Sequence, residues 1–279
     1  MVKRLVRLRI ASAAIFAVAA LSAGAALAAD ELYRSRDVVT GTDERYRTPG
    51  LVNTFEDVLV KVYGNPDIPG DPRLVALEAN VADYVDAFTY RDMMADQPIH
   101  DEQGTHDRPN EITVDFNPAK IAAALQTLGL KPWPEPRPRL VIFVAVKKEQ
   151  NAFVLASDFE GINEMREALD NVAKEAAVPY ALLDQAALAK AGLDFASLPS
   201  RDPAGLVDLA KTVGGEVPIV GNLFWSEPDL GWVATWRMMA GDTLAAWEVR
   251  GVSFDGGFRS GVSGAAKILS GNGVPRPAP

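Results

Sequence analysis

The two histidines of the chain, His100 and His106, lie in one short polar segment with acidic neighbours. Imidazole and carboxylate groups are ligands for a metal such as zinc, which commonly takes four of them. The candidate ligands are His100, Asp101, Glu102, His106 and Asp107. Their spacing matches no standard ligand motif. Two interpretations therefore stay open: a metal-binding loop, or a structural loop whose acidic side chains cap backbone N–H groups.

Four tryptophans lie near the carboxyl-terminal end of the sequence. Strand alternation places Trp232 and Trp236 on one face of a strand whose hairpin partner carries Trp247, and Trp225 precedes that strand. Exposed rings on a sheet can bind sugar rings or a partner peptide. Such a stripe is more often core, here covered by the final helix. The alternative makes Trp225, Trp232, Trp236 and Trp247 binding residues.

The sequence contains no recognisable catalytic set. The segment Gly261–Ala265 resembles a nucleophile elbow, but its last glycine is replaced by alanine and it lies within a predicted helix, where small residues serve packing. No glycine-rich segment ends in the Lys-Ser or Lys-Thr of a phosphate loop. Acid pairs such as Glu56-Asp57 occur in any acidic chain and do not by themselves indicate glycoside hydrolysis. We therefore predict no catalytic residues and no cofactor.

Composition narrows the class of protein further. With 48% hydrophobic and 23% charged residues among 279, the chain can form its own apolar cores. It has no cysteine, which excludes disulfides, thiolate metal sites and the lipid-bearing cysteine of a lipoprotein. The net charge is −9, which disfavours nucleic acid and anionic lipid surfaces as partners.

The first residues are typical of an export signal. Four basic residues precede an alanine-rich apolar stretch that ends in Ala26-Leu27-Ala28, a small-x-small cleavage site. We expect residues 1–28 to be removed by cleavage near Ala28, which places the mature protein in the periplasm. No other segment is long and apolar enough to predict a transmembrane helix. Loss of the four basic residues changes the net charge from −9 to −13. An uncleaved membrane anchor is the alternative.

Residues 30–130 are predicted to form an amino-terminal domain with the order β-α-α-β-α. Proline after a capping residue marks three helix starts, at Thr48-Pro49, Asp71-Pro72 and Asn117-Pro118. The predicted elements are strands over 32–40 and 112–116 and helices over 49–63, 72–88 and 118–128, the second helix carrying an apolar stripe that reaches Phe88.

Residues 131–139 contain four prolines and are predicted to link two domains. The following domain, 140–270, has the order β-α-β-α-β-β-β-α, which predicts an α/β (α+β) fold with a mixed sheet packed by helices. Residues 271–279 are predicted to be a disordered tail. The elements are strands over 140–146, 179–183, 217–224, 232–238 and 243–249, and helices over 162–176, 203–213 and 254–269.

Several short segments resemble the proteobacterial secreted family called domain of unknown function 2066. They are Leu59–Pro66, the segment from Phe116-Asn117-Pro118 through Leu128-Gly129-Leu130, Pro132-Trp133, Arg137-Pro138 and Trp232–Trp236. The resemblance covers nearly the whole mature chain and carries over no catalytic residue. The element order after Leu140 also resembles small α/β domains of envelope assembly proteins, such as the amino-terminal domain of the Tol propeller protein and the activators of peptidoglycan synthases. That likeness implies binding rather than catalysis.

These observations predict a non-catalytic periplasmic protein that docks on another envelope protein through a sheet edge or the tryptophan hairpin. A second hypothesis is a metal or ligand binder, including a metal-assisted hydrolase, that uses residues 100–107. A third is a cell-wall glycan binder that uses the tryptophans.

Overall fold

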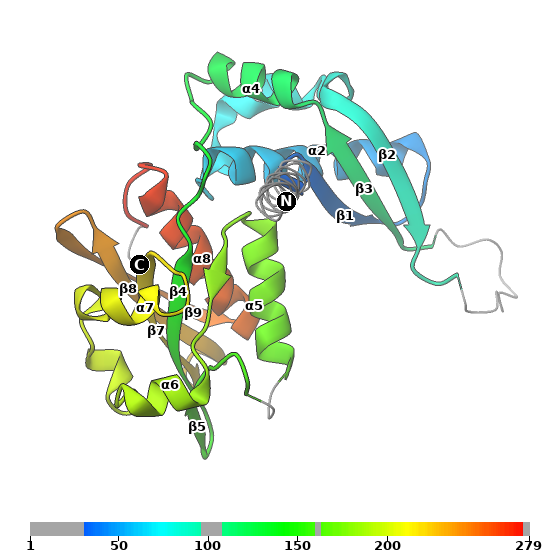
Figure 1. Cartoon of the computed structure of the whole chain (residues 1–279). Helices are drawn as coiled ribbons and strands as arrows, with labels where there is room; N and C mark the ends of the chain where they lie inside the picture. The colour runs from blue at the N-terminus through cyan, green and yellow to red at the C-terminus, as the bar shows by residue number, and fades with distance from the viewer. Residues whose placement is uncertain (1–30, 96–107, 160–162, 276–279) are drawn as a thin grey trace, which may run out of the picture. The chain divides into compact units, whose positions relative to one another are not determined.

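The computed structural model describes residues 31–95, 108–159 and 163–275, which form two compact units (Figure 1). The first unit comprises Met1–Val58 and Val75–Ala124, and the second comprises Leu59–Leu74 and Leu125–Pro279. The division falls within two helices, α2 (Glu44–Tyr63) and α4 (Pro118–Thr127). The predicted domain boundary at residues 131–139 stays a prediction. Each unit is described by itself.

The first unit contains a three-stranded antiparallel sheet in the order β1-β3-β2. The central strand, β3, alternates buried and half-buried residues, because one of its faces is covered. A Cβ atom on Gly50 of α2 would lie 2.7 Å from Val39 Cγ1, so glycine allows the helix to approach the sheet closely. The strands are β1 (Arg34–Val39), β2 (Val85–Asp92) and β3 (Asn110–Phe116), and α3 (Val75–Glu78) is a single turn.

The predicted helix over residues 72–88 is wrong. This segment forms a 3₁₀ turn at Pro72–Leu74, the turn α3, a second 3₁₀ turn at Val81–Tyr84, and then strand β2. The predicted apolar stripe ended at Phe88, and the pairing of Val85–Asp92 with β3 makes this segment a strand instead. The order of the unit is therefore β-α-α-β-β-α instead of β-α-α-β-α.

Helix α2 begins five residues before the predicted start at Pro49. The carbonyl of Asp43 accepts the N–H groups of Tyr46 (3.0 Å) and Arg47 (2.9 Å), so the first turn forms ahead of the proline. Pro49 lies just beyond that turn, where its missing N–H removes one helical hydrogen bond. The predicted end is confirmed, since Gly64 follows with a positive φ of 77°.

The second unit contains a mixed six-stranded sheet in the order β5-β4-β7-β8-β9, with β6 also paired to β4. Strands β4 and β7 are parallel, whereas β7, β8 and β9 form an antiparallel meander. The predicted mixed sheet is confirmed. The strands are β4 (Leu140–Lys148), β5 (Asn151–Val154), β6 (Tyr180–Ala181), β7 (Val217–Ser226), β8 (Gly231–Ala240) and β9 (Thr243–Val252).

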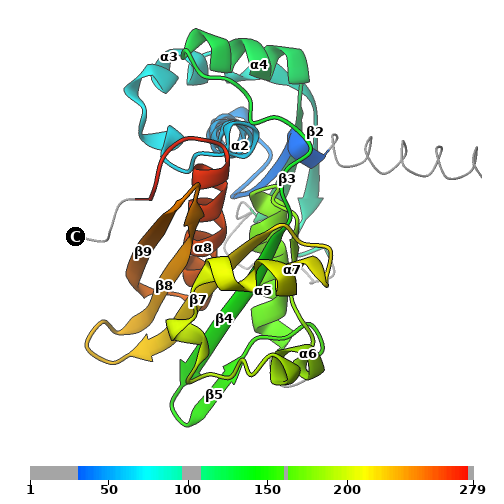
Figure 2. The same ribbon diagram turned by 60° about the vertical axis from the view of Figure 1, so that its left-hand side comes forward.

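Helices cover both faces of this sheet (Figure 2). One core lies between the sheet and helices α5 (Asn163–Glu175) and α8 (Phe254–Leu269). The other lies between the sheet and helices α6 (Gln185–Lys190) and α7 (Val207–Lys211) with their loops. All seven residues from Leu140 to Val146 are apolar and buried, because both faces of this strand are covered.

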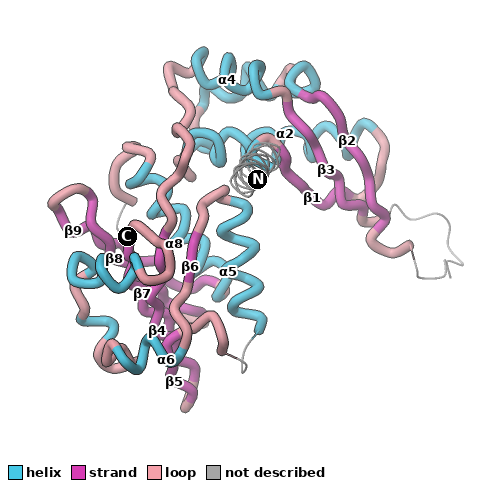
Figure 3. Tube along the Cα trace, viewed as in Figure 1, coloured by secondary structure: helices cyan, strands magenta, loops and turns pink. Residues whose placement is uncertain are grey.

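Two short elements of the second unit, β5 and α6, were not predicted. The proline-rich residues 131–139 form no helix or strand, as expected (Figure 3). They nevertheless contribute buried side chains, because the Arg137 guanidinium stacks on the Trp133 ring at 4.4 Å. Arg137 also donates to the carbonyl of Lys61 at 2.9 Å, which fixes this segment within the second unit.

Candidate functional site

The predicted metal ligands His100, Asp101, Glu102, His106 and Asp107 lie outside the described residues, as does the predicted signal of residues 1–28. Within the described ranges, no group of three or more His, Cys, Asp or Glu side chains could hold a metal ion. Among the same residues, no helix has the length and apolar character needed to cross a membrane.

Three of the four tryptophans that were candidate binding residues are buried beneath α8. Trp232, Trp236 and Trp247 expose 5%, 1% and 5% of their surface, which agrees with the interpretation of this stripe as core. The indole N–H of Trp236 donates to the carbonyl of Gly257 (3.1 Å), and that of Trp247 donates to the carbonyl of Ser260 (3.0 Å). Trp225 is half-buried, and its indole N–H donates to Glu227 (2.7 Å).

Glycines on α8 make this packing possible. A Cβ atom on Gly261 would lie 2.5 Å from Trp236 Cε2, and one on Gly264 would lie 2.6 Å from Trp247 Cε2. The helix therefore lies against the indole rings without an intervening side chain. The segment that resembled a nucleophile elbow is thus a packing surface within a helix, as its position predicted.

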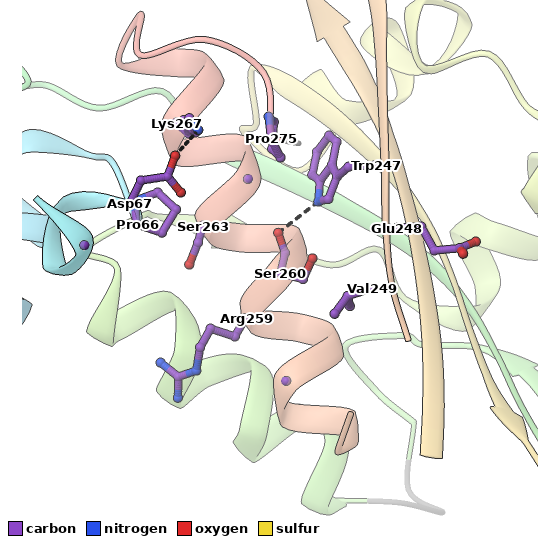
Figure 4. A pocket seen from close by; sticks show the side chains of 13 residues that line it. Pro66, Asp67, Trp247, Glu248, Val249, Arg259, Ser260, Ser263, Lys267 and Pro275 are labelled. Carbon is purple, nitrogen blue, oxygen red and sulfur yellow. Dashed lines mark hydrogen bonds and ion pairs between the residues drawn. The ribbon is translucent and has the colours of Figure 1, made fainter. Parts of the chain in front are cut away.

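An open groove of about 770 Å³ runs between α8 and the last strand of the sheet, β9 (Figure 4). Trp247, Glu248 and Val249 of β9 line one side, and small or polar residues of α8 line the other. The α8 residues are Gly256, Arg259, Ser260, Ser263, Gly264 and Lys267, and the groove is completed by Pro66, Asp67, Gly70 and Pro275.

One end of the groove is closed by the segment after α2. The Lys267 ammonium is 2.5 Å from an Asp67 carboxylate oxygen, and the Lys267 side chain is only 9% exposed. Ser270 donates to the carbonyl of Gly64 (3.0 Å), and Asn272 donates to the carbonyl of Tyr63 (3.0 Å). These contacts fix residues 63–67 against the end of α8 and anchor the start of the predicted tail.

The outer edge of β9 is open. Within residues 31–95, 108–159 and 163–275, no strand pairs with it. Ala240 faces Thr243 across the turn Gly241-Asp242, and the φ of 61° at Gly241 is typical of a two-residue hairpin closed by a hydrogen-bonded pair. Because antiparallel pairs alternate from that point, the N–H and C=O groups of Leu244, Ala246 and Glu248 face away from β8.

The charges around this edge are balanced. Arg250 donates to Asp229 (3.0 Å) and to Glu248 (2.8 Å), and the hydrogen bonds from Arg250 and Ser226 lower the pKa of Asp229. Arg259 of α8 pairs with Glu175 at 2.5 Å. The groove therefore presents backbone hydrogen-bonding groups, an indole edge and hydroxyl groups without an excess of either charge.

Sequence reasoning missed most of this groove. It located the hairpin and the final helix, yet Asp67 and Lys267 are separated by 200 positions and no pattern links them. One usable signal was present: β9 is the last strand of a meander and is followed directly by a helix, so it is a candidate edge strand.

Residues 26–134 match the profile of a protein family described as a domain of unknown function (DUF8605). The match agrees with the expectation of an uncharacterised domain, whereas the specific resemblance to domain of unknown function 2066 is not confirmed. No curated protein and no solved structure matches the chain significantly. The matched segment contains Asp67 but neither β9 nor α8.

Proposed function

We propose that the mature protein is a non-catalytic interaction protein of the periplasm that binds an extended segment of another envelope protein along β9. The observation that carries this proposal is the open edge of a ten-residue strand beside a groove. A partner strand placed there adds to the sheet, and its main chain bonds to β9.

The chemistry of the groove defines the segment that fits. Successive side chains of an added strand point alternately into the groove and to the opposite face. Those that enter meet the Trp247 indole, Val249 and the hydroxyl groups of Ser260 and Ser263. Lys267 is neutralised by Asp67, so a charged side chain gains little there. The expected partner is an uncharged segment that places small apolar or hydroxyl side chains at every second position.

The periplasmic location rests on the sequence. The basic residues, apolar stretch and small-x-small site of residues 1–28 support export by a cleaved signal, and the lack of cysteine supports a protein without a lipid anchor. The sequence resemblance to the secreted family called domain of unknown function 2066 also supports export to the periplasm. Amino-terminal sequencing of the purified mature protein is expected to give Ala29 or Asp30 as the first residue.

Site-directed photo-crosslinking in cells tests the binding surface. A crosslinking amino acid at position 246, on the open edge of β9, is compared with one at position 152, an exposed alanine of β5 at the opposite edge of the same sheet. We expect one reproducible partner from position 246, with the crosslinked peptide forming an extended run of residues. Equal capture of the same partner from both positions would contradict the proposal. So would the absence of any crosslink from position 246 in cells with an intact periplasm.

A further inference from the structure

The indole N–H of Trp232 differs from those of three other tryptophans of the sheet. Trp225, Trp236 and Trp247 each donate to a named acceptor, at 2.7, 3.1 and 3.0 Å. In the described part of the chain, the Trp232 N–H has no acceptor, although only 5% of this residue is exposed. Nearly buried donors usually have a partner, so this N–H is open to an acceptor from a ligand.

A ligand can reach this N–H. Among the described residues, the Trp232 nitrogen is not one of the fully enclosed polar atoms that lack a partner. Because it lacks a partner, it must retain accessible surface. Trp232 also lines a cavity of about 370 Å³, a volume within the range of small-molecule sites.

The walls of this cavity are mainly apolar and are held by packing. Val146 of β4 and Phe153 of β5 lie opposite each other in a strand pair. Met165 of α5 is buried, and Phe254 at the start of α8 meets the Trp232 ring edge-on, with 6.4 Å between the centroids. These side chains leave an apolar space between the sheet and the first turns of two helices, beside the Trp232 N–H.

The rim of the cavity carries charges of both signs. Lys148 of β4 and Glu164 of α5 line it and are exposed, as is Asn151 of β5. One cation and one anion leave no net charge to attract an ion. A charged ligand would also lose hydration against the apolar walls, so these features favour a neutral ligand.

We propose that this cavity binds a small neutral molecule that has an apolar body and a carbonyl oxygen. The oxygen accepts the Trp232 N–H, and the body packs against Phe153, Met165 and Phe254. The cavity shares no lining residue with the β9 groove, so this site does not depend on the proposed partner.

NMR titration of the full-length mature protein, followed by its indole N–H resonances, tests this with two planar ligands of the same shape. Acetophenone carries the carbonyl oxygen, and α-methylstyrene has a CH₂ group in its place. We expect acetophenone to bind about fivefold more tightly, as one neutral hydrogen bond contributes. The Trp232 N–H resonance should move downfield with acetophenone only, while that of Trp236 stays.

Trp232→Phe removes the N–H group and keeps an aromatic ring, so it should abolish the preference for acetophenone. A folding defect alone would weaken both ligands and leave the preference at about fivefold. The matched control is Trp236→Phe, which removes an N–H that bonds to Gly257 and should keep the preference.

The proposal would be overturned by equal affinity of acetophenone and α-methylstyrene for the unaltered protein, or by a Trp232 resonance that does not move. A preference retained by the Trp232 variant, or lost equally in the Trp236 variant, would overturn it as well. Tighter binding of benzoate or benzamidinium, which are planar ions of the same shape, would overturn the assignment of a neutral ligand.

Discussion

The two edges of the six-stranded sheet are built differently. On one side, β4 is flanked by two short strands, β5 with four residues and β6 with two, which pair with opposite ends of it. On the other side, β9 is a ten-residue strand whose outer groups are open. Proteins usually shorten or cover exposed edges to avoid unwanted pairing. The long open edge beside a groove is therefore the one that we propose for partner binding, whereas the short strands of the divided edge limit pairing there.

Proline at the outer edge of β9 should have the largest effect. Ala246→Pro removes an N–H group that faces away from β8, so the fold should persist while partner binding falls about a hundredfold through lost main-chain bonding and a steric clash. Affinity for the crosslinked peptide and circular dichroism measure the two effects.

The matched control for that change is Ala152→Pro, on the short edge strand β5, which should leave binding unchanged. Equal loss of binding in both variants would remove the distinction between the two edges. If Ala246→Pro unfolded the protein, the Ala246 N–H group would be bonded to β8. The assignment of Leu244, Ala246 and Glu248 as the outward-facing residues would then be wrong.

Packing of α8 on β9 gives the next largest effect. Gly264→Ala places a methyl group against the Trp247 ring and should lower the free energy of unfolding by about 1–3 kcal/mol. The substitution should also increase the hydrogen-exchange rate more in β9 than in β5. Gly205→Ala, where nothing lies within 4 Å of the added Cβ atom, is the control and should be neutral or slightly stabilising. Greater stability of the Gly264 variant would contradict close packing.

The ion pair at the end of the groove should contribute less. Asp67→Ala leaves the Lys267 ammonium buried without this partner and should cost about 1–2 kcal/mol in urea unfolding. Lys267→Met removes the buried charge together with the pair and should be nearly neutral. If the methionine variant were the less stable of the two, the pair itself would be strongly stabilising.

The smallest expected effect is a pH dependence of the unfolding free energy that arises in the first unit and not in the β9 groove. In the first unit, partial burial and a hydrogen bond to Glu78 raise the pKa of Glu56 to about 7. Because the folded state prefers the protonated form, its contribution is complete below about pH 4.5 and is lost as pH rises through 7. Solvent screening of this partly buried pair reduces the loss to about 1 kcal/mol.

Glu56→Gln should remove this pH dependence of the unfolding free energy, while peptide binding along β9 should be equal at pH 6 and pH 8. Asp229, beside β9, has a pKa lowered by Arg250 and stays ionised across that interval. A pH-dependent affinity in the Glu56 variant would assign the titrating group to the groove instead.

Local patterns predicted the second unit better than the first. The strand over 140–146, the tryptophan hairpin and the start of the last helix at residue 254 each carry a short-range signal, and all three are confirmed. Residues 85–88 of β2 were predicted as helix because an apolar stripe of helical spacing reaches Phe88, and pairing with β3 overrides that local pattern. The groove could not be predicted, since it requires residues 66–70 to lie against α8.

The irregularity near the end of β9 limits what can be added to the edge. Opposite Trp232 and Ala234, β9 contains an extra residue, and Gly251 adopts a φ of 66° there, as in a β-bulge. The regular ladder is thus confined to Thr243–Val249, about 23 Å at roughly 3.3 Å per residue. An edge of this length can pair with a segment of about seven residues, and the bulge sets the point at which an added strand must end.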